Sequence, residues 1–99
     1  MKEQLINLIS ILEDPGFTGF NTHNYNQGIE SINKKSLGTS LETICCNLFH
    51  YTNDGEIRKK DLEHKNMQES ELKKLISFLK SGNIESAQKI NFLGNSNGL

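Results

Sequence analysis

The sequence has no valine, no tryptophan, one alanine and one proline. Val, Ile and Thr favour strands, and here isoleucine and five threonines supply all the β-branched residues. A β-sandwich is therefore disfavoured. Leucine and isoleucine provide most of the 34% hydrophobic content, a composition typical of Leu-rich helices.

Long apolar runs and an excess of charge are also missing. The longest wholly apolar run is Ile44–Cys46, which predicts neither a membrane-spanning helix nor a secretory signal, so we expect a soluble, cytoplasmic protein. A formal net charge of -1 gives no long-range reason to expect binding to nucleic acid or to an anionic membrane. A chain of 99 residues fits one small domain, which we place at residues 1–94, with a flexible tail at 95–99.

Cysteine is scarce, and Cys45 and Cys46 are adjacent in a helical pattern, where a disulfide between them would be strained. We expect free thiols, with Cys45 in the core and Cys46 at its edge. Cys46 and His50 share a helix face, as two zinc ligands do, but tetrahedral zinc needs two more, and His23 and His64 are the remaining donors. We therefore predict no metal and no cofactor. No carboxylate is placed to orient a Cys46/His50 nucleophile pair, so we also predict no catalytic residue and no enzyme.

Hydrophobic periodicity predicts a compact all-α bundle of about five short helices. The expected helices cover residues 2–13, 22–34, 39–53, 66–80 and a last segment from 84 that ends before Gly94. The wide apolar arc of the first helix, which includes Ile6 and Ile11, predicts contacts on two sides. The third helix has the cleanest stripe and is expected to be central; its members are Leu41, Ile44, Cys45, Leu48, Phe49 and Thr52.

Short polar motifs predict where these helices begin. Thr39 and Glu42 match a capping box, in which each side chain accepts from the other residue's amide, and Leu37 before them suits a hydrophobic staple. Asn21 or Thr22 is expected to cap the second helix, and Asn66 the fourth. Asn83 is expected to cap the last one.

Two segments do not fit a long helix. Residues 15–21 form a glycine-punctuated loop whose Phe17 and Phe20 either plug the core or face a partner. Residues 56–65 contain only Ile57 and Leu62 as apolar residues, five apart and so on different helix faces. We expect this second segment to be a solvated connector with at most one helical turn.

The surface offers one candidate binding patch. Basic pairs and triplets at 34–35, 58–60 and 73–74 have acidic neighbours, which argues against direct nucleic-acid binding. If the connector folds over the helix ends, an acidic edge beside His50 and Tyr51 would suit a basic cleft in a partner protein, with Tyr51, Phe17 or Phe20 adding affinity. The alternative is an ordinary surface of interleaved charges. The acidic residues of this edge are Asp54, Glu56, Asp61, Glu63, Glu69 and Glu71.

The run Leu41-Glu42-Thr43-Ile44-Cys45-Cys46-Asn47-Leu48-Phe49, followed by a polar turn, a Lys-Lys-Asp connector and a final helix, resembles small bacterial immunity proteins of polymorphic and contact-dependent growth inhibition toxin systems, such as the MafI type. The resemblance covers residues 37–80. It implies a helical protein that binds one cognate toxin domain, often a nuclease, and blocks it without chemistry. The near-neutral charge differs from the acidic character usual for nuclease inhibitors, so the immunity role is implied more directly than the nuclease target.

The leading hypothesis is therefore an immunity protein that occludes the active site of a toxin domain. The alternative is a small helical regulatory or adaptor protein, such as a phage-encoded inhibitor or a weak DNA-binding regulator. The sequence does not indicate an oligomeric state.

Overall fold

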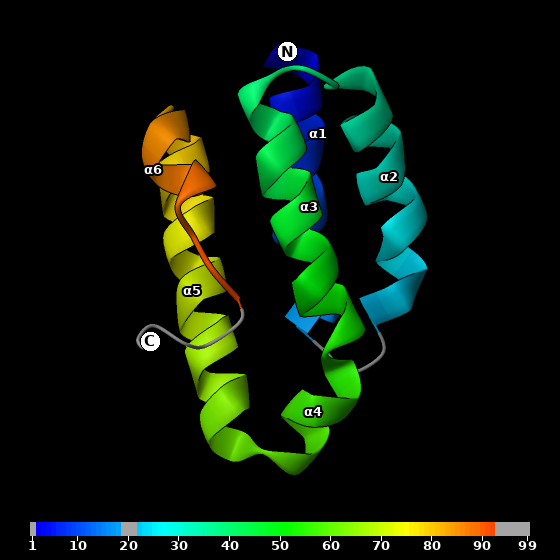
Figure 1. Ribbon diagram of the computed structural model, residues 1–99, viewed down its shortest axis with the longest axis vertical. Coiled ribbons are helices and arrows are strands. Elements are labelled where there is room, and N and C mark those ends of the chain that lie inside the picture. The colour runs from blue at the N-terminus through cyan, green and yellow to red at the C-terminus, as the bar shows by residue number, and fades with distance from the viewer. Residues whose placement is uncertain (1, 19–21, 93–99) are drawn as a thin grey trace.

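The computed structural model describes residues 2–18 and 22–92, and within these ranges the protein is all-α (Figure 1). Phe20, Gly94 and the expected tail at 95–99 lie outside the described residues. In chain order the elements, with η for a 3-10 helix, are α1 (Lys2–Leu12), η1 (Pro15–Thr18), η2 (Thr22–Tyr25), α2 (Asn26–Lys35), α3 (Ser40–Asn53), α4 (Gly55–Lys60), α5 (Leu62–Lys80) and α6 (Ile84–Gln88).

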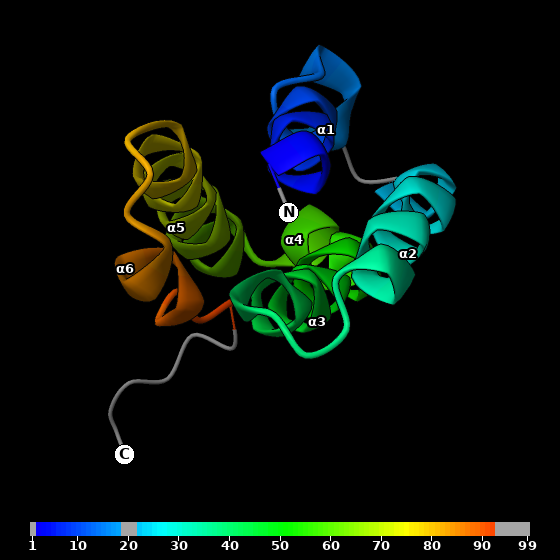
Figure 2. The ribbon, with the colours of Figure 1, turned by 90° about the horizontal axis from the view of Figure 1, so that it is seen from above.

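The helices surround one core in the order α1, α2, α3, α6, α5, each packing on the next, and α5 returns to α1 (Figure 2). α1 contacts both α2 and α5, which confirms the prediction from its wide apolar arc. Ile6 nevertheless stays 58% exposed on the outer side. α4 packs on α5 and on the end of α3, at the lower end of the molecule in Figure 1.

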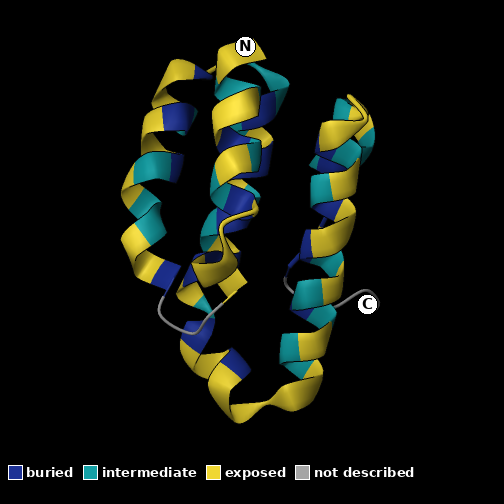
Figure 3. Ribbon diagram, turned by 180° about the vertical axis from the view of Figure 1, so that it is seen from behind, coloured by how far each residue is buried: buried dark blue, intermediate teal, exposed yellow. Residues whose placement is uncertain are grey.

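Buried residues lie on the inward faces of these helices, while most residues on the outward faces are exposed (Figure 3). The predicted stripe of α3 is confirmed: Leu41, Cys45 and Leu48 are fully buried, and Phe49 packs against the core from its edge. The core residues contributed by the other helices are Leu8, Leu12, Ile29, Ile32, Leu72, Leu75, Leu79 and Ala87.

Several predicted caps are confirmed. The Thr39 hydroxyl accepts a hydrogen bond from the Leu41 amide (3.2 Å), and Asn83 Oδ1 accepts from the Ser86 amide (3.2 Å). The predicted reciprocal capping box between Thr39 and Glu42 is wrong, because the Glu42 amide donates to the Thr39 carbonyl (3.2 Å) and Glu42 Oε1 accepts from the Gly38 amide (2.9 Å). The Thr39 amide already donates to the Ser36 carbonyl.

Other predicted helix starts are wrong. α5 begins at Leu62 rather than after Asn66, since Asp61 Oδ1 accepts from the His64 amide (3.1 Å) and caps it. α2 begins at Asn26 after a 3-10 turn, because Thr22 is buried and its hydroxyl donates to the Thr52 carbonyl (3.2 Å). Leu37 is 62% exposed, so it makes no buried staple.

The two segments expected to be irregular both contain short helices. Pro15–Thr18 forms a 3-10 turn that inserts Phe17 into the core, so the plug rather than the partner-facing alternative is correct for this residue. The expected solvated connector instead forms α4, which adds a sixth α-helix within the described residues. Its Arg58 is 1% exposed and is the reason why the segment folds against the bundle.

Candidate functional site

A network of buried polar side chains is centred on Arg58. Its Nη1 donates to the Tyr51 carbonyl oxygen and to Gln68 Oε1 (2.8 Å), and its Nη2 donates to Thr22 Oγ1 (3.3 Å). The guanidinium carbon also lies 3.9 Å from the centre of the Tyr51 ring, a cation-π contact. Arg58 thereby joins α4 to η2, α3 and α5.

Gln68 of α5 extends this network to the C-terminal segment. Its Nε2 donates to Asp54 Oδ2 (2.9 Å) and to the Phe92 carbonyl (2.7 Å), while its Oε1 accepts from Arg58. Asp54 Oδ2 also lies 3.3 Å from His64 Nε2, and both side chains are about one fifth exposed. All polar atoms of the buried Gln68 amide are therefore paired. These hydrogen bonds fix the positions of its partners, since the loss of any one of them leaves a buried polar group without a hydrogen bond.

Burial changes the acid-base properties of this region. It lowers the pKa of Arg58, while Tyr51, Asp54 and Glu69 act in the opposite direction. Burial raises the pKa of Tyr51, and the nearby Arg58 charge partly opposes that rise. The negative charges of Asp54 and Glu69 therefore help to keep Arg58 protonated inside the fold.

Around this buried arginine, the chain turns from α4 into α5 and presents an exposed surface. We call it the α4–α5 tip and define it as the exposed residues Glu56, Ile57, Lys59, Lys60, Asp61, Leu62 and Glu63. Ile57 is 48% exposed and Leu62 is 67% exposed, so two of the four exposed large aliphatic side chains among the described residues belong to this tip. The tip thus combines two apolar side chains with charges of both signs. The hydrogen bonds of Arg58 hold the α4 part of this segment against the bundle.

The six predicted acidic residues do not form one continuous edge. Glu56, Asp61 and Glu63 lie at the tip and are exposed. Asp54 instead bonds to His64 and Gln68 inside the polar network. Farther along α5, Glu69 pairs with Lys65 (3.2 Å) and Glu71 pairs with Lys74 (3.0 Å). Of the six predicted acidic residues, only Glu56, Asp61 and Glu63 are therefore exposed, and Lys59 and Lys60 lie beside them.

Two of the predicted partner-binding aromatics are wrong as surface residues. Phe17 and Tyr51 are fully buried and stacked, with ring centres 5.3 Å apart. Tyr25 packs edge-on against Phe17, and Phe92 packs against Tyr51. Phe20 lies outside the described residues. His50 is exposed, but on α3 rather than on the tip.

Both cysteines are free thiols and Cys45 is buried, as predicted, whereas Cys46 is exposed rather than at the edge of the core. Among residues 2–18 and 22–92, no three His, Cys, Asp or Glu side chains are grouped so that one chain could hold a metal ion. No helix in the same ranges is long and apolar enough to cross a membrane.

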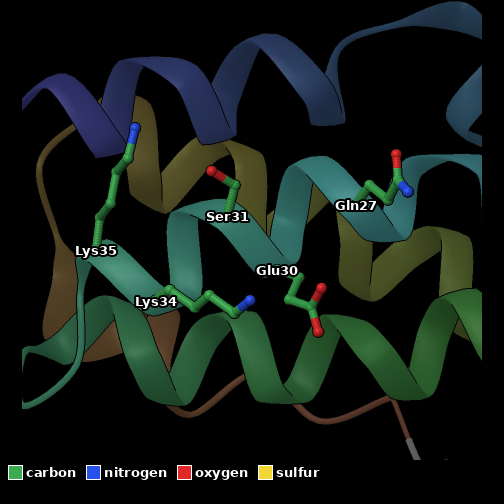
Figure 4. A pocket seen from close by; sticks show the side chains of 5 residues that line it. All are labelled: Gln27, Glu30, Ser31, Lys34 and Lys35. Carbon is green, nitrogen blue, oxygen red and sulfur yellow. The ribbon is translucent and has the colours of Figure 1, made fainter.

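Two shallow hollows lie away from the tip. One, of about 340 Å³, follows the line between α1 and α2, where Gly28 allows close approach: a Cβ added there would lie 3.0 Å from Ile11 Cδ1. The other, of about 400 Å³, lies on the outer side of α2 (Figure 4). Its lining consists of Gln27, Glu30, Ser31, Lys34 and Lys35. Both are open to solvent rather than enclosed, so neither would bury most of a small ligand's surface.

Sequence reasoning missed the role of Arg58 and Gln68. Arg58 stands beside Lys59 and Lys60, which is the pattern of a solvated basic cluster. Ile57 and Leu62 gave no periodic signal either, because they belong to two different helices. Only the position of Gln68 on the inward side of α5, in register with Leu72 and Leu75, could have indicated burial.

Comparisons with known proteins give no relative for this chain. No family model matches it, and no curated protein or solved structure shows significant similarity to it.

Proposed function

We propose that this protein is a non-enzymatic inhibitor that acts in the bacterial cytoplasm and neutralises a cognate toxin domain by covering its active site. The resemblance of residues 37–80 to immunity proteins supports the toxin as partner. The α4–α5 tip lies within this segment, and its exposed apolar and charged side chains support a role in binding a partner.

The observation that carries the proposal is the exposure of Ile57 and Leu62 on a rigid base. Aliphatic side chains that enter a partner's pocket contribute affinity through burial, and charges around them select and steer the partner. Because Arg58 and Gln68 hold α4 against α5 before binding, little conformational freedom is lost when the tip docks.

The charges at the tip indicate the kind of surface that it fits. Glu56, Asp61 and Glu63 complement a basic cleft, which a nuclease needs in order to hold phosphates. Lys59 and Lys60 lie between Glu56 and Asp61 in the sequence. A partner that pairs with these two cations needs acidic groups at the rim of the same cleft. We therefore propose a nuclease toxin as the target, with the apolar pair at the centre of the interface.

The experiment is co-expression of the protein with the toxin domain encoded next to it, followed by pull-down. Wild type is expected to rescue growth and to form a complex. Leu62→Asp should lose both, because it places a charge in the apolar centre of the interface. The matched control is Leu37→Asp, since Leu37 is similarly exposed (62%) but lies between α2 and α3; it should behave as wild type. Neither rescue nor complex formation by the wild type would refute the inhibitor function.

A kinetic measurement then tests the role of charge. Glu56→Lys should lower the association rate with a basic partner and weaken its dependence on salt, with little effect on folding. Asp61 is a poorer choice because it caps α5, so its replacement would also affect stability. An unchanged association rate for Glu56→Lys would mean that the interface lies away from the tip.

A further inference from the structure

The outer face of α3 carries a row of exposed side chains opposite the core. Thr43, Cys46, His50 and Asn53 are all exposed, and their spacing of three or four residues places them along one side of the helix. We call them the α3 outer row. The buried residues Leu41 and Leu48 lie on the opposite side of the same helix. Cys46 and His50 therefore point away from the body of the protein.

This face has no charge of its own. From Thr43 to Asn53 the sequence contains no Asp, Glu, Lys or Arg, although such residues make up 23% of the chain. On the side toward α2, Glu30 and Lys34 extend from α2 toward α3 (Figure 4). Depletion of charged residues in the centre, with a charged rim, is typical of protein–protein interfaces.

Cys46 and His50 also form half of a metal site. Residues four apart on a helix have Cβ atoms about 5–6 Å apart, which lets a thiolate and an imidazole bind one ion. Zinc requires four ligands in a structural site, and the described residues do not bring a third donor to this pair. His64 bonds to Asp54 in the polar network, and His23 belongs to η2.

We propose that two copies of this chain pack through the α3 outer row and bind one zinc ion between them, with Cys46 Sγ and a ring nitrogen of His50 from each copy. A two-fold axis through the ion brings the same two residues from both chains, which completes a tetrahedral Cys2His2 set. On binding, each Cys46 thiol releases its proton to solvent and becomes a thiolate.

The charge balance fits the surface. One Zn²⁺ with two thiolates and two neutral imidazoles carries no net charge, so the completed site can be buried between two faces that lack charged groups. Opposed copies of a neutral face also do not repel each other. The inference does not depend on the proposed function, because it uses a different face of the molecule.

The experiment measures the mass of the full-length protein by light scattering after size exclusion, in a phosphine reductant, with and without ZnSO₄. We expect a monomer without zinc and a dimer with one zinc per two chains. Cobalt in place of zinc should give the visible absorption bands of tetrahedral Co²⁺ with thiolate ligands. Cys46→Ser and His50→Gln should each abolish the zinc-dependent dimer.

The control is His23→Gln, which removes an exposed histidine outside the α3 outer row and should leave the dimer intact. A circular dichroism spectrum of each variant shows whether it is folded. A protein that stays monomeric with zinc would overturn the proposal. So would a dimer that forms without metal, or zinc binding that survives Cys46→Ser. If the zinc dimer forms but the protein binds no toxin, only the proposed function is contradicted.

Discussion

The two ends of the bundle are stabilised by different kinds of contact. Around the upper part of α3, leucines and isoleucines of α1, α2, α3 and α5 pack on one another. Around α4, the space between helices is filled by Arg58, Gln68 and Thr22, with their hydrogen bonds. Apolar packing tolerates small adjustments, whereas the polar end depends on every partner being present. Substitutions should therefore act differently at the two ends.

The largest effect is expected for Arg58→Ala. It leaves the Tyr51 carbonyl and Gln68 Oε1 buried without their donor, and each buried acceptor left unsatisfied costs about 1–3 kcal/mol of unfolding free energy. Lys59→Ala is the control, because Lys59 is the exposed neighbour. Urea unfolding followed by circular dichroism measures both. Equal stability of the two variants would show that the polar end contributes nothing specific.

Leu48→Ala tests the apolar end. Leu48 is fully buried in α3, and truncation of such a leucine costs about 2–5 kcal/mol through lost burial and a cavity. Leu62→Ala, at the exposed tip, should change the unfolding free energy by less than about 0.5 kcal/mol. The same urea titration gives both values. A mild effect at Leu48 would mean that α3 is not the centre of the core.

Alkaline pH should weaken the apolar end through Cys45. Burial raises the pKa of its thiol from 9.0 to about 12. Between these values the unfolded chain loses the thiol proton while the native protein keeps it, so the free energy of unfolding falls as pH rises. Cys45→Ala should make this fall shallower between about pH 8.5 and pH 10, below most lysine titration. Identical slopes for wild type and Cys45→Ala would contradict the assignment of this effect to Cys45.

The smallest effect is expected at the cap of α5. Asp61→Ala removes the acceptor for the His64 amide and should cost about 1 kcal/mol. Asp61→Asn keeps an acceptor oxygen and should retain most of the stability. Thermal unfolding distinguishes the two variants, and an equal loss in both would mean that the charge, rather than the hydrogen bond, stabilises this helix start.

The same contrast explains which parts of the structure could be predicted from the sequence. Leu8, Leu48 and Leu72 each belong to a stripe of apolar residues at helical spacing, in α1, α3 and α5. Periodicity alone therefore predicted these helices and the burial of these residues. The start of α5 was placed a turn too late because both Asp61 and Asn66 suit a cap, and few apolar residues lie between them. Where no apolar stripe lies between two candidate caps, hydrophobic periodicity does not show at which of them the helix begins.

Arg58 could not be predicted, because its burial depends on partners from three other elements, η2, α3 and α5. Thr22, Tyr51 and Gln68 provide its partners, and only the folded chain brings them together. The candidate site was anticipated in part: the acidic residues of the tip were chosen, but Tyr51 and Phe17 were assigned to the surface although the aromatic cluster needs them inside. The neighbouring sequence of an aromatic residue does not show whether its side chain packs in the core or lies on the surface.

The C-terminal segment also determines when the fold can be completed during synthesis. α6 bridges α3 and α5, and beyond it Asn47 Nδ2 donates to the Ile90 carbonyl (3.2 Å) while Gln68 holds the Phe92 carbonyl. A ribosome releases these residues after all the other described helices, so the nascent bundle keeps one side open until then. A message truncated after the codon for Lys80 would yield a chain with its leucines open to proteases, and cells should degrade it quickly.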